Sequence, residues 1–363
     1  MNRKPESSSS TNSMLYDSAG FPSLMVRIPL FFMNEISSNF ENIPHPMFQT
    51  SKGIAPYVYI SKYQNITING RAYSLAGQSA QNFISYDEAL ACCREKGPGW
   101  HLMTNWEWAG LALWSLKNHT LPRGNNASGT DCTHPNEFGM PVPHIPGEHP
   151  GRILTGSGPA SWSHDHTPQG VFDCNGNLAE WVGGLRMENG KLLWLTPEES
   201  ANSNAQRRDS PNWKSLLPDG SFVSPDAAHA LHFDYTCAPP AAGGTPDFCL
   251  TDGCSYPQRI YEQSRPGIDQ TYGHQPFSDF SCRFPLSQNA LQLLKAACVL
   301  PLSRDCTPGD LYFRNDQESA ALRGGHWYHG RSAGMFWLNL AHEPTYRAER
   351  IGFRCSFVNP EYC

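Results

Sequence analysis

Short runs of apolar residues, each interrupted by glycine, proline or polar residues, follow one another along most of the chain. The runs at residues 24–32, 57–60 and 66–73 are rich in aliphatic and aromatic residues and predict short strands near the N-terminus. Strand character returns at residues 321–357. Such a pattern is typical of a fold that is built from short strands and much irregular structure.

Two helices are marked by their N-terminal sequences. Ser85 with Glu88, and then Thr104 with Glu107, have the spacing of a capping box. In this motif the hydroxyl accepts the backbone N–H of the third helical residue, and the Glu carboxylate accepts the N–H of the capping residue. A further helix is predicted at residues 287–300.

The composition changes along the chain and suggests its organisation. Residues 1–20 are polar and serine-rich, so we expect a disordered arm there, followed by one domain at residues 21–363. Residues 186–316 are punctuated by proline and glycine and contain few periodic segments. Within a compact domain, so long a stretch indicates an elaborated insertion.

The charge balance restricts the classes of partner. The 363 residues include 27 Lys+Arg and 33 Asp+Glu, a formal net charge of −6, which disfavours a nucleic-acid-binding protein. No apolar run reaches the roughly 18 residues that span a bilayer. The N-terminus also lacks the apolar part of a secretory signal. We therefore expect a soluble protein without membrane insertion; association with a virion or a cell surface stays open.

The sequence gives no positive signal for catalysis. It contains no Gly-x-Ser-x-Gly elbow, P-loop, Gly-x-Gly-x-x-Gly or His-Glu-x-x-His motif. The twelve cysteines include no Cys-x-x-Cys pair. Buried free thiols in a reducing compartment are favoured over a local disulfide among Cys237, Cys249 and Cys254.

Residues 170–181 are dense in oxygen donors. Asp173 and Glu180 are separated by two asparagines and by Gly176, which allows a tight turn. A calcium ion takes about six to eight oxygen ligands of these kinds. The EF-hand spacing is absent, because Leu178 stands where that loop needs glycine. From composition alone, an ordinary Asn-Gly turn with a solvated Glu180 is the favoured alternative.

The C-terminal segment is the most informative part of the chain. Phe336, Leu338 and Leu340 alternate with Trp337 and Asn339, which predicts a half-buried strand with a mixed outer face. Tyr, His, Arg and Trp residues gather around this strand. That composition is typical of a binding surface, although a solvated strand and loop with chance aromatic residues is the alternative.

Six blocks of sequence, in order, carry a resemblance to a known group of proteins. They are YVYISKYQN, INGRAYSL, ALACCREKGPGWHLMTNWEWAGLALW, PRGNN, GVFDCNGNLAEWVGGL and LRGGHWY…IGFRC. Together they resemble the formylglycine-generating-enzyme-like branch of the C-type-lectin fold, and within it the variable proteins of diversity-generating retroelements. The resemblance extends from about residue 22 to residue 355 and implies a single α+β domain with short antiparallel strands, two main helices and extensive irregular structure.

The same resemblance implies a function. In the retroelement proteins, error-prone reverse transcription at template adenines diversifies codons near the C-terminus, and the resulting side chains form a ligand-binding face on a rigid frame. The variable region would be residues 322–355, and the ligand a protein or glycan on a target surface. The solvent-facing, ligand-binding residues would be Tyr328, His329, Arg331, Trp337, Asn339, Ala341, His342, Tyr346, Arg347, Ala348 and Arg350. An asparagine codon mutated only at its adenines does not readily give Trp or Glu, so Trp337 and Glu349 match the pattern less well.

Support and metal residues are implied in the same way. The invariant support would be Arg323, Gly324, Gly325, Trp327, Leu338, Leu340, Gly352 and Phe353. In the enzyme branch, a turn like that at residues 173–180 binds calcium through two side chains and two carbonyls. The resemblance therefore implies a structural Ca²⁺ held by Asp173, Gly176, Leu178 and Glu180.

Departures from the family pattern distinguish its branches. The copper oxidases of the branch carry two cysteines after the Arg-Gly-Gly-Ser-Trp block, but residues 328–354 contain none. Since Cu(I) needs soft thiolate ligands, we expect no copper. The His-x-x-x-His-x-Glu motif of the iron sulfoxide synthases is absent too, so we expect no iron. The sequence thus predicts a non-enzymatic, receptor- or adhesin-like protein; the alternative is an enzyme of the sulfatase-modifying type with an unrecognised active site.

Overall fold

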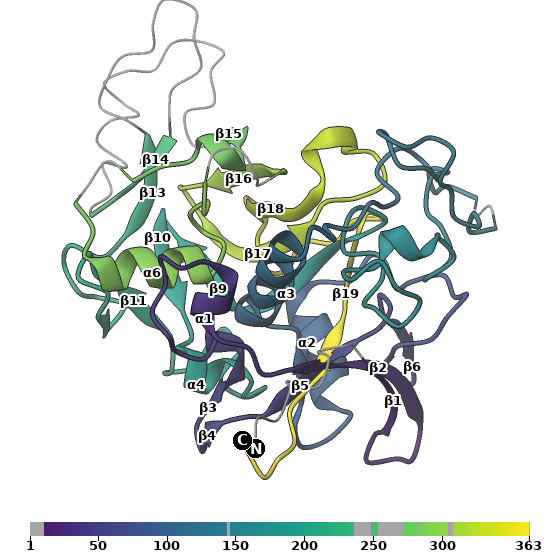
Figure 1. Ribbon diagram of the computed structural model, residues 1–363, viewed down its shortest axis with the longest axis horizontal. Helices are drawn as coiled ribbons and strands as arrows, with labels where there is room; N and C mark the ends of the chain where they lie inside the picture. The colour runs from purple at the N-terminus through teal and green to yellow at the C-terminus, as the bar shows by residue number, and fades with distance from the viewer. Residues whose placement is uncertain are drawn as a thin grey trace, which may run out of the picture.

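The computed structural model describes residues 11–143, 146–235, 248–252, 272–282, 285–303 and 308–362. The fold is α+β, as predicted, with two larger sheets and few helices (Figure 1). None of the helices in these residues is long and apolar enough to cross a membrane.

The smaller of the two main sheets joins the N-terminal strands to the C-terminal one. Its five strands have the order β1-β2-β5-β20-β8. Their bounds are β1 Thr11–Tyr16, β2 Pro22–Pro29, β5 Tyr57–Ser61, β8 Trp100–Leu102 and β20 Cys355–Phe357. The strands predicted at residues 24–32 and 57–60 are therefore present.

The predicted disordered arm is wrong over part of its length. Residues Thr11–Tyr16 form β1, which pairs antiparallel with β2 from Thr11 opposite Arg27 to Tyr16 opposite Pro22. Most side chains of β1 are exposed, so the strand depends on backbone pairing at the sheet edge. A polar edge strand leaves no hydrophobic alternation in the sequence, which explains the error. Residues 1–10 lie outside the described residues.

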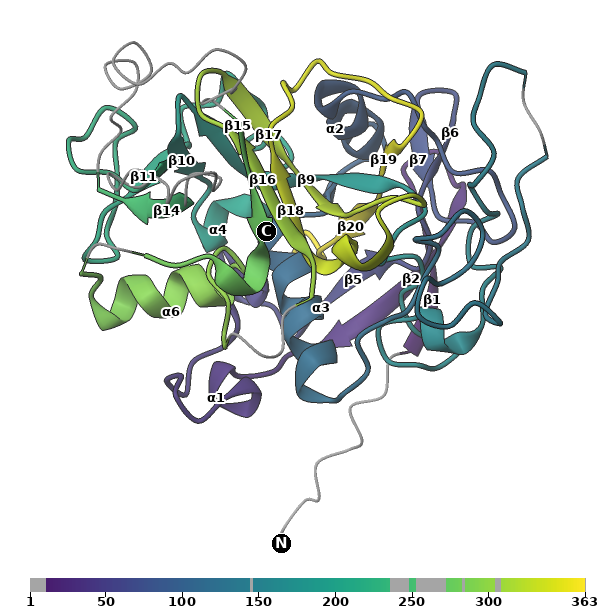
Figure 2. The ribbon, with the colours of Figure 1, turned by 90° about the horizontal axis from the view of Figure 1, so that it is seen from above.

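The two main helices begin where the capping boxes predict. Helix α2 spans Tyr86–Arg94 and α3 spans Asn105–Lys117. The Ser85 N–H donates to Glu88 Oε2 at 3.0 Å, and the Thr104 N–H donates to Glu107 Oε2 at 2.7 Å. Nearly every side chain of α3 is buried, because this helix runs through the centre of the molecule (Figure 2).

The larger sheet carries the C-terminal segment. Its main path is β12-β11-β10-β9-β17-β18-β16-β15; β13 pairs with β10 and β14, and β19 pairs with β9. The bounds are β9 Ala179–Glu188, β10 Lys191–Trp194, β11 Lys214–Leu216, β12 Phe222–Val223, β13 His232–Tyr235, β14 Phe248–Thr251, β15 Tyr272–Pro276, β16 Asp310–Arg314, β17 Glu318–Gly324, β18 Gly334–Leu340 and β19 Ile351–Phe353.

The stretch predicted as an insertion supplies both margins of this sheet. Strands β10 to β12 extend it on one side, and β15 with β16 extends it on the other. The same stretch contains α4 (Pro197–Ser200) and α6 (Gln288–Ala296). Helix α6 begins one residue after the predicted start, with Ser287 as its N-cap, and ends earlier than expected. The described strands of this stretch therefore widen the sheet.

Short elements complete the described chain. They are α1 (Met33–Ile36), the hairpins of β3 (Gln49–Thr50) with β4 (Gly53–Ile54) and β6 (Ile66–Ile68) with β7 (Arg71–Tyr73), and the 3₁₀ turns η1 (Pro46–Phe48), η2 (Ala160–Trp162), η3 (Phe277–Asp279) and η4 (Gly330–Ser332). The run predicted as one strand at residues 66–73 is the second of these hairpins.

Apolar side chains cover both faces of the central strands. Helices α2 and α3 lie on opposite sides of β9, β17 and β18 (Figure 2). Phe336, Leu338 and Leu340 pack in the larger cluster with residues of α3. Trp337 packs in a second cluster that includes Leu90 of α2. Strand β18 is thus buried along its whole length.

Candidate functional site

The predicted variable region folds as two loops joined by one strand. Strand β17 ends at Gly324, and Gly325 follows it; their φ angles are +88° and +72°. Residues with a side chain rarely adopt such angles, so this turn depends on glycine. The first loop contains η4, the strand β18 follows, and the second loop occupies residues 341–350.

Seven of the predicted ligand-binding residues reach the surface. Tyr328 is 78% exposed, and Arg331 and Arg347 are exposed as well. The partly buried members are His329, His342, Tyr346 and Arg350. All of them come from the two loops.

Four predicted members are not solvent-facing, which corrects the expectation from sequence. Trp337 is only 2% exposed, and the others are Asn339, Ala341 and Ala348. The reason is that β18 lies between β17 and β16, with packed side chains on both faces. Alternation along the chain identifies two faces but does not show that both are covered.

The residues that the resemblance implies as support are buried. Leu338, Leu340 and Phe353 are inaccessible, and Trp327 is nearly so. Arg323 is also inaccessible, and its Nε and Nη2 donate to Asn105 Oδ1 at 3.0 and 2.7 Å. This contact joins β17 to the start of α3 beneath the variable region.

Stacked aromatic rings lie beside the apolar cluster that contains Trp337. His342 and Tyr346 stack with ring centroids 4.3 Å apart and planes 5° apart. His274 stacks on Tyr312 at 4.3 Å, and Tyr312 lies 6.1 Å from the ring of His329. Sequence reasoning missed His274 and Tyr312 because they belong to β15 and β16, whose position beside β18 no local signal reveals.

The two loops carry charges of both signs: Arg331, Arg347 and Arg350 are positive, and Glu343 and Glu349 of the second loop are negative. Burial, together with the nearby charge of Arg350, lowers the pKa of His329 and of His342 to about 4, so both imidazoles are neutral at pH 7. Arg347 pairs with Glu88 at 2.8 Å. Within the described residues, no carboxylate oxygen lies within 4.0 Å of Arg331 or Arg350.

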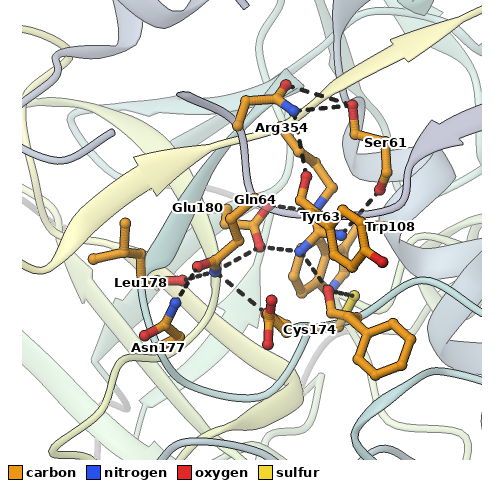
Figure 3. Close-up of polar contacts among 12 residues, drawn as sticks. Ser61, Tyr63, Gln64, Trp108, Cys174, Asn177, Leu178, Glu180 and Arg354 are labelled. Atoms are coloured by element: carbon orange, nitrogen blue, oxygen red, sulfur yellow. Dashed lines mark hydrogen bonds and ion pairs between the residues drawn. The ribbon is translucent and has the colours of Figure 1, made fainter. Parts of the chain in front are cut away.

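The predicted metal turn lies in the interior beneath this region. Glu180 stands in β9 and is 1% exposed, so the alternative of a solvated Glu180 is wrong. Its Oε2 accepts Arg354 Nε at 2.6 Å and its Oε1 accepts Arg354 Nη2 at 2.5 Å (Figure 3). Arg354 also donates to the carbonyls of Ser61 and Phe172, at 3.2 and 3.0 Å.

A buried amide occupies the point where other oxygens of the turn converge. Gln64 Nε2 donates to the Leu178 carbonyl at 2.8 Å, to Glu180 Oε1 at 3.0 Å and to the Asp173 carbonyl at 3.3 Å (Figure 3). Asn177 Nδ2 donates to Gln64 Oε1 at 2.8 Å, which fixes the orientation of the amide.

The Asp173 carboxylate points to a different neighbour. Its Oδ2 accepts the backbone N–H of Gly156 at 2.9 Å, while its buried Oδ1 has no partner among the described residues. Burial raises the pKa of this carboxyl to about 6. Gly176 has a φ of +82°, and a Cβ there would lie 2.0 Å from the Asn125 carbonyl, so the turn packs tightly.

These donors and acceptors, as arranged, do not fit calcium. A calcium ion needs free oxygen lone pairs directed at one point. Here, Leu178 and Glu180 already accept N–H groups, and the guanidinium of Arg354 adds a positive charge.

Comparison with known proteins finds similar solved structures, two of which are named here. The chain matches no protein-family model and no curated protein. It is similar to "Treponema denticola variable protein 1", with 11% identity, a TM-score of 0.31 and coverage of 95% of this chain and 98% of that one. It is also similar to "Structure of PvdO from Pseudomonas aeruginosa", with 12% identity, a TM-score of 0.28 and coverage of 96% and 98%.

Proposed function

We propose that this chain is a non-enzymatic, receptor- or adhesin-like protein that binds a macromolecular ligand through its C-terminal face. The ligand class is a protein or a glycan on a target surface. The observation that carries the proposal is the contrast within one segment: Tyr328, Arg331 and Arg347 are exposed, while the strand between their loops is buried on both faces.

The face consists of the seven residues that reach the surface. They are Tyr328, His329, Arg331, His342, Tyr346, Arg347 and Arg350. Exposed substitutions usually change the free energy of unfolding by no more than about 0.5 kcal/mol. Such positions can therefore vary in sequence while the buried strand keeps its geometry, as diversification requires.

Stacking supports a binding role for this face. The rings of His342 and Tyr346 already stack on each other and are nearly parallel. Ordered aromatic side chains lose little conformational entropy when a ligand covers them. The positive charges of Arg331 and Arg350 have no close carboxylate among the described residues, which leaves them available to an acidic or hydrogen-bond-accepting ligand.

The neighbouring DNA tests the proposal directly. We expect a reverse-transcriptase gene and a near-copy of the codons for residues 326–354 that differs from them at adenines. The adenines should fall on codons of the seven surface residues and should spare those of Leu338 and Leu340, which are inaccessible. If no such repeat exists, or if its adenines fall on the codons of the inaccessible residues, the proposal is wrong.

A further inference from the structure

The contacts around Glu180 point to a structural role for two side chains that lie far from it in sequence. We propose that the guanidinium of Arg354, together with the amide of Gln64, fills the place of a bound cation at residues 173–180, so that the fold and its C-terminal face need no calcium. This inference does not depend on the proposed function, because it concerns the interior of the frame.

The first argument is the pairing of charge. Glu180 and Arg354 form two parallel hydrogen bonds of 2.5 and 2.6 Å, and their side chains are 1% and 0% exposed. A buried carboxylate needs a compensating charge, and a bidentate arginine supplies it with fixed geometry. No charge on Glu180 remains for an ion to neutralise.

The second argument is the use of lone pairs. Gln64 Nε2 lies within 2.8 to 3.3 Å of oxygens of Leu178, Glu180 and Asp173. An ion at this position would have to displace the amide, and Asn177 holds that amide in place. The unpartnered Asp173 Oδ1 is a single ligand, whereas calcium takes about six to eight.

The third argument is mechanical. Arg354 stands between β19 and β20 and binds the carbonyl of Ser61 at the end of β5, the carbonyl of Phe172 and the carboxylate of Glu180 in β9. The Arg354 side chain therefore forms hydrogen bonds to a strand of the smaller sheet and to a strand of the larger one. A structural metal ion commonly serves to join separate segments in this way.

The requirement for calcium is tested on the full chain, with and without available calcium. Thermal unfolding is measured with added calcium and with excess EGTA, and equilibrium dialysis measures bound calcium. We expect equal melting temperatures and no bound calcium. A melting temperature that falls in EGTA, or bound calcium that Glu180→Gln abolishes, would overturn the proposal.

Variants test the role of the guanidinium itself. Arg354→Lys keeps one charge but loses the bidentate geometry and the carbonyl contacts. We expect its melting temperature to fall on the order of 5 °C or more, with no recovery in calcium. Arg347→Lys is the matched control, since Arg347 is exposed and pairs with Glu88, and it should melt like wild type. An Arg354→Lys protein that melts like wild type contradicts the proposal. If that variant does not fold, the wild-type comparison still decides.

Discussion

Trp337 and Tyr328 lie nine positions apart in the same segment but have opposite roles. The indole of Trp337 lies 5.7 Å from the ring of Tyr312 and 5.1 Å from that of His329. The Tyr328 ring is 78% exposed, although it stacks loosely on His326. Their energetic contributions should therefore differ even though both are aromatic residues of the predicted variable region.

Substitution by alanine should separate the two roles. Trp337→Ala leaves a cavity in a packed cluster and is expected to lower the free energy of unfolding by about 3 to 5 kcal/mol. Tyr328→Ala removes an exposed ring and should change it by no more than about 0.5 kcal/mol. Urea unfolding of both variants measures the difference. Equal losses would mean that our placement of these side chains is wrong.

The polar contacts around Glu180 join residues that are adjacent in sequence to residues that are distant, and only the adjacent ones could be predicted. The turn at Asp173–Glu180 was predicted as a unit because its residues are adjacent in sequence. Gln64 and Arg354 were not connected with it, since they lie 116 and 174 positions from Glu180. Only the folded chain brings an ordinary Gln and an ordinary Arg to these oxygens, and neither residue type signals such a role in sequence.

Elements that depend on local contacts were predicted well. Helices α2 and α3 begin at their capping boxes, because each box is formed within four consecutive residues. Strands β10 to β12 were not predicted, since they contain only two to four residues each. Strands this short are fixed by pairing with distant partners, which a periodic pattern cannot reveal.

The turn between β9 and the segment before it offers a test at the scale of an element. Gly176 and Gly70 have similar φ angles of +82° and +74°. A Cβ on Gly176 would lie 2.0 Å from the Asn125 carbonyl, whereas one on Gly70 meets nothing within 4 Å. Alanine at either position would therefore have the same unfavourable left-handed backbone conformation, but only at Gly176 would its Cβ also clash with a neighbouring atom.

Alanine at each glycine should reveal this difference. Gly70→Ala is expected to cost about 1 to 2 kcal/mol from backbone strain alone. Gly176→Ala adds overpacking against backbone and should cost roughly a further 1 to 3 kcal/mol. Chemical denaturation of the two variants provides the comparison. If Gly70→Ala were the more destabilised, the docking of this turn on Asn125 would be refuted.

At the scale of the whole molecule, the C-terminal segment crosses from one sheet to the other. It runs through β17 and β18 of the larger sheet, pairs β19 with β9, and ends in β20 of the smaller sheet. The loops of the proposed binding face therefore connect strands of the larger sheet, and the chain that follows them is held in the smaller sheet. Its stability should follow that of the entire domain.

Histidines with lowered pKa values are distributed across this domain and make its stability depend on pH. Burial is the main cause for each of them. The pKa falls to about 3 for His45, about 4 for His164, about 2 for His326, and about 4 for His329 and His342. In the unfolded chain the same groups titrate near 6.5, so the unfolded state binds more protons between these values.

The contribution of these histidines to the free energy of unfolding should therefore be fully present above about pH 6.5. It should decline as the pH falls toward about 4, because the imidazoles take up protons on unfolding. Melting temperatures measured across this range test the expectation. The double variant His329→Gln, His342→Gln removes two of the contributing groups and should show a shallower decline than wild type. His119→Asn, at an exposed position, serves as the control and should leave the slope unchanged. A wild-type melting temperature that is constant from pH 6.5 to 4 would mean that these imidazoles take up protons in the folded protein, contrary to their burial.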